Sequence, residues 1–166
     1  MKGLKDMLIR RIGRMLLAGI LCAQLLAAAA VPGEEAAHPY TNILDHKNAD
    51  GQLLEESFLD AEGQPVLCEQ GYAYAAYEYD EWGDVNCERY YDADHKPVLT
   101  AGGYHMVTRD FEGKNEKTGE AYFGTDEKPV EIGDGYCEIT FTYQDDGSML
   151  LTYLDKSGGI VKTEEK

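Results

Sequence analysis

A spacing of 32 residues recurs along the chain and constrains its fold more than any other feature. Sliding the sequence by that amount superposes three prolines and the valine that follows each of them: Pro65, Pro97 and Pro129. It also superposes three glycine–tyrosine pairs, at residues 71–72, 103–104 and 135–136. Matching two prolines and two glycines by chance has a probability of roughly 10⁻⁵ per frame at ordinary amino-acid usage. The spacing therefore indicates a structural repeat.

A fourth column of the repeat predicts a tight turn. Gly83 is matched by Asn115 and Gly147, and glycine and asparagine are the residues that best tolerate a positive φ. The flanking runs alternate between polar and apolar residues, as at 73–79, where one face reads Ala, Ala, Tyr, Tyr. Period-two alternation on both sides of a three- to five-residue loop is typical of a β-hairpin.

The proline column predicts the segment that joins one hairpin to the next. Proline has no N–H to donate to a central ladder, so the Pro-Val segments are expected to be edges or connectors. Because a lone hairpin is marginal in water, the units must join to bury their faces. The predicted fold is all-β: about three antiparallel β-hairpin units of 32 residues, with partial caps at 47–60 and 153–161, in an extended sheet or solenoid-like stack. The third copy is one residue short, since Tyr122 is matched by Tyr153.

The N-terminal thirty residues differ from the rest of the chain. A basic head is followed by the apolar run MLLAGILCAQLLAAAA, with Ala28 and Ala30 where an A-x-A cleavage site needs small residues. This pattern predicts a secretory signal peptide over 1–30, and the run is shorter than the ~20 residues of a membrane span. A retained N-terminal anchor is the alternative. Residues 31–46 are predicted to be a linker and 47–166 the repeat domain of a secreted or cell-surface protein.

Charge excludes several classes of partner. Removing residues 1–30 takes away five basic residues and one acid, which moves the formal charge from −16 to −20. Such a chain repels phosphate backbones and anionic headgroups, so no nucleic-acid partner and no membrane contact beyond the signal segment are expected. Acidic turns such as 60–62 lack the full spacing of a calcium loop, and we expect no metal and no cofactor.

The residues that often carry catalysis do not form a known motif in this sequence. It contains no G-x-S-x-G, no H-E-x-x-H and no phosphate-binding glycine loop. Cys68, Cys87 and Cys137 have no C-x-x-C spacing, so we expect small buried side chains, with one disulfide arithmetically possible. The chain is therefore predicted to be non-catalytic. A small hydrolase that uses His105 or the acidic turns is the enzymatic alternative.

Tyrosine is the most suggestive residue type, with twelve copies after residue 30. Rigid amphipathic rings can stack on sugars or peptides at low entropic cost. Five tyrosines are therefore predicted to be exposed and to bind a ligand: Tyr74, Tyr90, Tyr104, Tyr122 and Tyr136. The alternative is structural, because tyrosine is also a good half-buried strand residue.

Two phrases carry a resemblance to known repeats. YEYDEWGDV, at 77–85, resembles the tyrosine–aspartate units of YD (RHS-type) repeats, and RYYDADHKPV, at 89–98, is similar to cell-wall-binding and glucan-binding repeats of secreted bacterial proteins. The likeness covers 47–161, with a period longer than in either family and a single tryptophan, Trp82. It implies an extracellular β-hairpin array of the bacterial envelope that binds cell-wall polysaccharide or a surface protein. A spacer without a ligand is the alternative.

Overall fold

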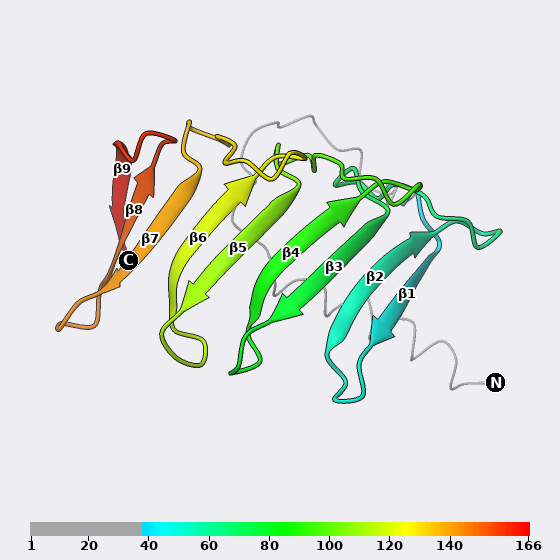
Figure 1. Cartoon of the computed structure of the whole chain (residues 1–166), viewed down its shortest axis with the longest axis horizontal. Helices are drawn as coiled ribbons and strands as arrows, with labels where there is room; N and C mark the ends of the chain where they lie inside the picture. The colour runs from blue at the N-terminus through cyan, green and yellow to red at the C-terminus, as the bar shows by residue number, and fades with distance from the viewer. Residues whose placement is uncertain (1–37) are drawn as a thin grey trace, which may run out of the picture. The chain divides into compact units, whose positions relative to one another are not determined.

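Residues 38–166 fold into one antiparallel sheet of nine strands in the computed structural model, which describes this part of the chain (Figure 1). The spatial order of the strands is their order in the sequence, so each strand pairs only with its neighbours along the chain. The strands are β1 (Asn42–Lys47), β2 (Leu53–Leu59), β3 (Tyr74–Tyr79), β4 (Val85–Tyr91), β5 (Met106–Phe111), β6 (Lys117–Phe123), β7 (Glu138–Tyr143), β8 (Met149–Leu154) and β9 (Ile160–Glu165). The all-β prediction is confirmed for these residues.

The described residues contain no helix, and so none that could cross a membrane. The predicted signal peptide and most of the predicted linker lie outside this part of the chain. The first strand nevertheless begins at Asn42, inside the segment 31–46 that was expected to be a linker. The sheet thus starts five residues before the predicted boundary at residue 47. The mixed polar sequence of this strand, NILDHK, gives no clear strand signal, and its pairing with β2 is what identifies it.

One kind of tight turn builds nearly every reversal of the chain. The first residue donates its N–H to the carbonyl of the fifth, and the fourth donates back to the carbonyl of the first. The fourth residue has a positive φ in every case. These turns span 48–52, 60–64, 68–72, 80–84, 92–96, 100–104, 124–128, 132–136, 144–148 and 155–159. Three of them, at 60–64, 68–72 and 80–84, make up one unit, and the turn at 92–96 begins the next, which accounts for the repeat spacing.

The left-handed positions predicted from glycine and asparagine are confirmed. Asn115 has φ of +62°. The matching glycines on either side of it along the chain, Gly83 and Gly147, have φ of +85° and +88°. The glycines that precede the recurrent tyrosines have nearly the same φ, +85° at Gly71 and Gly103 and +91° at Gly135. Two further left-handed residues without a glycine or asparagine signal were not foreseen, His95 and Glu127, both with φ of +58°. Of the two, Glu127 is the less expected, because histidine is enriched at positive φ whereas glutamate is not.

An aspartate side chain closes many of these turns. The Asp60 Oδ1 accepts hydrogen bonds from the N–H groups of Glu62 and Gln64, at 3.0 and 2.8 Å. The same two-bond arrangement recurs at turns that begin with Asn48, Asp80, Asp92 and Asp155. Local side-chain acceptance of this kind stabilises turns and explains why the acidic residues gather there.

Each proline stops the connector from becoming a strand. Pro65, Pro97 and Pro129 each form one isolated antiparallel bridge, to the last residue of the preceding strand. The chain then turns again and enters the next hairpin. The predicted connector role of the Pro-Val segments is therefore confirmed, and Figure 1 shows these segments along one end of the sheet.

The residue that the third copy lacks is a β-bulge. In the β3–β4 hairpin the register shifts between Glu78 and Tyr79, and in the β5–β6 hairpin it shifts between Asp110 and Phe111. The β7–β8 hairpin pairs without a shift. A bulge adds one residue to one strand of a pair. Without the bulge, the third copy is one residue shorter, and the strand pairs on either side keep their register.

Candidate functional site

A continuous row of eight aromatic rings runs across the sheet from β1 to β8, and we call it the aromatic ladder. Neighbouring ring centroids lie 4.7 to 6.2 Å apart, and most pairs meet edge to face. This is the favourable geometry for aromatic pairs. The rings belong alternately to a residue shortly before a first strand and to a residue within a second strand: Tyr40, Phe58, Tyr72, Tyr90, Tyr104, Tyr122, Tyr136 and Tyr153.

Four of the five tyrosines predicted to bind a ligand belong to the ladder. Tyr90 and Tyr122 are buried, at 7% and 9% exposure, whereas Tyr104 and Tyr136 are half-buried. Tyr74 lies outside the ladder, is 8% exposed and stacks on the ring of His95 at 3.6 Å. The exposure expected of these side chains is therefore wrong for Tyr74, Tyr90 and Tyr122. The connectors bring their own rings over the strand tyrosines, and strand alternation alone does not reveal this.

Carboxylates hold the hydroxyl groups of the ladder. Tyr90 donates to the Glu88 carboxylate at 2.5 Å, and Tyr122 donates in the same way to Glu120. Burial, followed by the neighbouring carboxylate, raises the pKa of both phenols far above the usual value. These hydroxyls stay protonated at all physiological pH values. They are fixed donors inside the sheet, rather than groups that exchange protons.

Arg109 on β5 lies between two of these carboxylates. Its guanidinium contacts Glu88 at 2.6 Å and Glu120 at 3.2 Å, while Lys117 contacts Glu120 at 2.7 Å. These four side chains are between 12% and 29% exposed. Burial acts to raise the pKa of Glu120, but the hydrogen bonds from Lys117 and Tyr122 and the charge of Arg109 hold it below its ordinary value. Glu120 is therefore ionised at neutral pH.

The same two positions are apolar in the last hairpin. Phe141 stands 32 residues after Arg109, and Leu151 stands 31 residues after Glu120. They pair directly across β7 and β8. Leu151 joins a buried apolar cluster with Val107, Ile139 and two ladder rings, Tyr122 and Tyr153, and Phe141 packs against it. The core of the sheet is thus ionic in the middle and apolar toward the C-terminal end.

Two tyrosines outside the ladder fasten one hairpin to the one before it. The Tyr79 hydroxyl donates to the carbonyl of Leu53 at 2.9 Å, and the Tyr143 hydroxyl donates to the carbonyl of Lys117 at 3.1 Å. The intervening unit has Phe111 at this position, which has no hydroxyl. There the N–H of Asn115 donates to the Asp84 carboxylate of the neighbouring hairpin, at 2.6 Å. Most tyrosines therefore have a structural partner.

The residues considered for catalysis are buried or occupied in turns. His105 is 2% exposed, and its Nδ1 lies 2.6 Å from the carbonyl oxygen of Tyr90. Cys68, Cys87 and Cys137 are buried free thiols, and burial raises the pKa of the last two. In the described part of the chain, no three His, Cys, Asp or Glu residues are grouped as a metal site would require.

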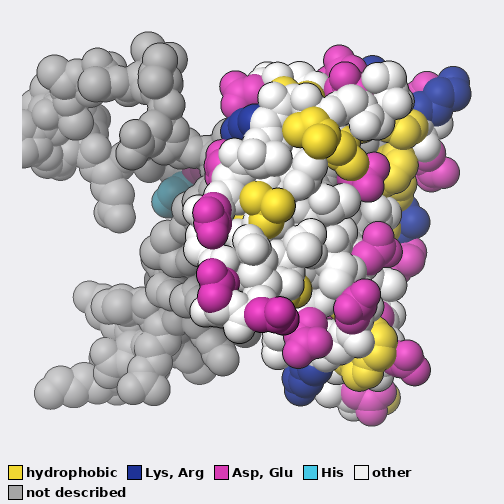
Figure 2. Space-filling view, turned by 90° about the vertical axis from the view of Figure 1, so that its left-hand side faces the viewer, with side chains coloured by type: hydrophobic (Ala, Val, Ile, Leu, Met, Phe, Trp, Pro, Cys, Tyr) yellow, Lys and Arg dark blue, Asp and Glu magenta, His cyan; other side chains and the backbone are white. Residues whose placement is uncertain are grey.

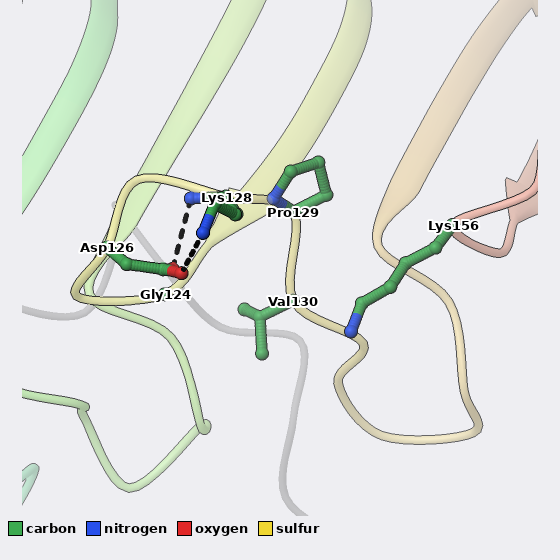
Figure 3. A pocket seen from close by; sticks show the side chains of 6 residues that line it. All are labelled: Gly124, Asp126, Lys128, Pro129, Val130 and Lys156. Carbon is green, nitrogen blue, oxygen red and sulfur yellow. Dashed lines mark hydrogen bonds and ion pairs between the residues drawn. The ribbon is translucent and has the colours of Figure 1, made fainter.

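A shallow hollow lies where the β6–β7 connector approaches the β8–β9 turn. It has a volume of about 490 Å³ and is lined by Gly124, Asp126, Lys128, Pro129, Val130 and Lys156. Figure 3 shows Lys156 reaching from its turn toward the connector. Lys128 is paired with Asp126 at 3.1 Å, whereas Lys156 has no hydrogen bond or ion pair within residues 38–166. The hollow could accept an anionic group beside an apolar surface.

Other exposed side chains are scattered. Trp82 in the β3–β4 turn and Tyr143 at the end of β7 are 41% and 54% exposed, and Leu67 and Leu99 are exposed on successive connectors. Figure 2 looks at the molecule from the side where β9 lies, and shows acidic side chains spread among apolar ones with few basic ones. This distribution agrees with the strongly negative charge of the chain.

Sequence reasoning missed the alternation that makes the ladder, although its signal was present. Tyr40 stands 32 residues before Tyr72, and Phe58 stands 32 residues before Tyr90. Comparison with models of known protein families, with curated proteins and with solved structures finds no match.

Proposed function

We propose that residues 38–166 form a non-catalytic repeat scaffold of an exported bacterial envelope protein, in which the tyrosines hold successive repeat units together. One observation carries this proposal: the aromatic ladder uses eight rings, in two alternating columns, to join all the hairpins. The strands β3, β5 and β7 have the same length and occupy the same positions of the repeat, which supports an array of like units. Export is proposed from the N-terminal leader, and the envelope from the resemblance to YD and wall-binding repeats.

The scaffold proposal is tested by separating ring packing from binding. Tyr104→Phe keeps a ladder ring and removes its hydroxyl, whereas Tyr104→Ala removes the ring. We expect the alanine variant to lower the urea midpoint strongly and the phenylalanine variant to lower it little. The phenylalanine variant could instead be as stable as the parent and yet lose binding to envelope material. That result would assign a binding role to the hydroxyl and contradict a purely structural ladder.

Attachment to cell-wall polysaccharide is a second function, and the hollow beside Lys156 supports it. A lysine without an ionic partner next to Pro129 and Val130 suits a glycan that carries carboxylate or phosphate groups. Ring stacking on sugars is less well supported, because the ladder rings are covered by their neighbours. Within this proposal the anionic group, rather than the sugar face, provides the attraction.

A pelleting experiment tests wall attachment. The chain is produced in an exporting host, incubated with purified cell walls, and the sedimented fraction is measured over a range of salt and Ca²⁺ concentrations. We expect Lys156→Glu to reduce sedimentation several-fold, and Lys114→Glu to leave it unchanged. Lys114 is a matched control because it lies in the exposed β5–β6 turn, at the other end of the strands. If nothing sediments under any condition, wall attachment fails and the scaffold role stands alone.

A further inference from the structure

The last strand, β9, occupies the place of a connector. The turn at 155–159 matches the turns at 60–64, 92–96 and 124–128, which lead into the prolines. Ile160 then pairs with Leu154 just as each proline pairs with the last residue of the preceding strand. Pairing then continues along β8 as far as Leu150 and Glu165, whereas each Pro-Val connector leaves the edge of the sheet soon after its single bridge. β9 is thus a segment in the position of a connector that continues as a strand.

β9 covers one edge of β8. In the earlier hairpins, the equivalent edge of the second strand pairs with the next hairpin. On β2, β4 and β6, this edge pairs with the first strand of the following hairpin over three residue pairs. The N–H of Tyr122 also donates to Cys137 beyond that register, and the ladder rings of Tyr122 and Tyr136 meet across the junction. On β8 a charged terminal strand takes this position instead.

The opposite end of the sheet presents an unpaired first strand. Tyr40 precedes β1 as Tyr72, Tyr104 and Tyr136 precede β3, β5 and β7, and its ring begins the ladder. Among residues 38–166, β1 pairs with β2 alone, so no strand of the described part of the chain covers its other edge. Leu44 on this strand is 59% exposed, although a leucine gains free energy by burial.

The register of the internal junctions brings the apolar residues of these two edges together. Gly119 pairs with Thr140, and Glu120 with Ile139. The same register, moved to the ends of the sheet, sets Leu150 opposite Leu44 and Leu151 opposite Ile43 of another copy. Two of the three cross-strand pairs then join aliphatic side chains. The ring of Tyr153 would meet Tyr40 of that copy and extend the ladder.

We propose that β8 of one copy receives β1 of a second copy, in the register of the β6–β7 junction, when β9 moves aside. The contact is head-to-tail, so it leaves the same two edges free at the ends and can repeat. In a single copy, Lys162 of β9 lies over the Tyr153 ring at 4.4 Å, and His38 lies beside Tyr40 at 5.4 Å. These two side chains occupy the positions that neighbouring rings take in the assembly, so β9 acts as a cap that limits growth.

Restoring the proline tests the cap. Ile160→Pro gives this segment the residue that the three connectors have, and each of those connectors forms one bridge and then leaves the sheet edge. We expect sedimentation velocity on the exported chain to show a concentration-dependent series of oligomers for this variant and mainly single copies for the parent. Ile160→Val, which changes the side chain without introducing a proline, is the matched control and should behave as the parent does. An Ile160→Pro chain that keeps its sheet and stays a single copy overturns the proposal.

Blocking the other edge tests the register. Phe58 and Glu56 direct their backbone groups toward β3, so Ile43, opposite Phe58, directs its own toward the open edge. Ile43→Pro therefore removes an N–H that no strand in the described part of the chain uses. The Ile160→Pro, Ile43→Pro double variant should be a single copy, and mixed with the parent it should form only a one-to-one complex. Oligomers of the double variant as large as those of Ile160→Pro would overturn the proposal.

A covalent trap covers the case in which the proline variant does not fold. Leu44→Cys and Leu150→Cys are placed together in an otherwise native chain and mildly oxidised. The equivalent internal pair, Cys87 and Thr108, is of the closely spaced kind, with Cα atoms about 4.5 Å apart, which a disulfide can bridge. β1 and β8 are too far apart in the strand order to be joined within one copy. We expect a series of disulfide-linked multimers, and no more than dimers from either single variant. Their absence overturns the proposal.

Discussion

The middle of the sheet and its C-terminal third pack the same ladder against different neighbours. In the middle, Arg109 lies between two glutamates, whereas the last hairpin has Phe141 and Leu151 at the matching positions. The ring positions are filled by aromatic residues in both regions. The comparison indicates that the ring positions stay aromatic while the row of side chains beside them is ionic in one region and apolar in the other.

Removing a ladder ring should have the largest effect, and a similar one in both regions. Tyr122→Ala and Tyr153→Ala are each expected to lower the free energy of unfolding by about 3–5 kcal/mol, because each deletes a buried ring that packs against its neighbours in the ladder. Urea denaturation measures the change. Tyr143→Ala, at a ring that is 54% exposed, is the control and should cost about 1 kcal/mol. Equal losses at all three positions would refute the special role of the ladder.

Breaking the ionic row should cost somewhat less. Arg109→Met leaves Glu88 and Glu120 near each other with one cation fewer, and we expect a loss of about 3 kcal/mol in urea denaturation. Copying the C-terminal third, with Arg109→Phe and both glutamates changed to leucine, should recover most of that loss, because a buried ion network can often be replaced by apolar side chains. A triple variant that is less stable than Arg109→Met would show that the two chemistries are not interchangeable.

The pH dependence of stability should differ between two glutamates at equivalent positions, Glu56 and Glu120. Burial and the facing Asp45 raise the pKa of Glu56, whereas the pKa of Glu120 is lowered. The stabilisation from Glu120 is present above its unfolded pKa of about 4.3 and is lost as the pH falls through its lower folded value. The penalty at Glu56 has the opposite sign, because it grows as the pH rises from about 4.3 through the raised folded value.

Glutamine variants measure the two contributions. At pH 7, Glu120→Gln should lower the free energy of unfolding by about 2 kcal/mol, since it loses charge-assisted hydrogen bonds. Glu56→Gln should raise it by about 0.5 kcal/mol, since it removes a like-charge pair across two strands. Both differences should shrink toward acid pH in urea titrations. The same sign for both variants at pH 7 would contradict the assignment.

Effects of about 1 kcal/mol or less are expected at the turns that precede the connectors. Gly63, His95 and Glu127 occupy the same position of the repeat, with φ of +79°, +58° and +58°. Glu127→Gly should stabilise the chain by about 0.5 kcal/mol, because relief of backbone strain outweighs the added entropy of the unfolded chain. Gly63→Ala should destabilise it by about 1 kcal/mol through backbone strain alone, since an added Cβ meets nothing within 4 Å. Thermal unfolding measures whether each variant is more or less stable than the parent.

The turns could be predicted from the sequence, because glycine, asparagine and proline determine backbone geometry locally. Gly83, Asn115 and Pro97 each indicated their conformation without tertiary information. The burial of Tyr90 and Tyr122 could not be predicted, since it depends on connector rings that fold over them. Strand β9 was also missed, although Ile160 matches Pro129 once the missing bulge residue is counted. Its match to the connectors suggested a short segment, and only its pairing with β8 as far as Glu165 shows a strand.

The agreement between strand order and sequence order has a mechanical consequence. When a chain of this topology is pulled from its two ends, the load falls on the outermost strand pair and opens it bond by bond, like a zipper. Each repeat unit released adds about 110 Å of slack. A surface protein built in this way would lengthen in steps under tension and take up the slack again when the tension falls.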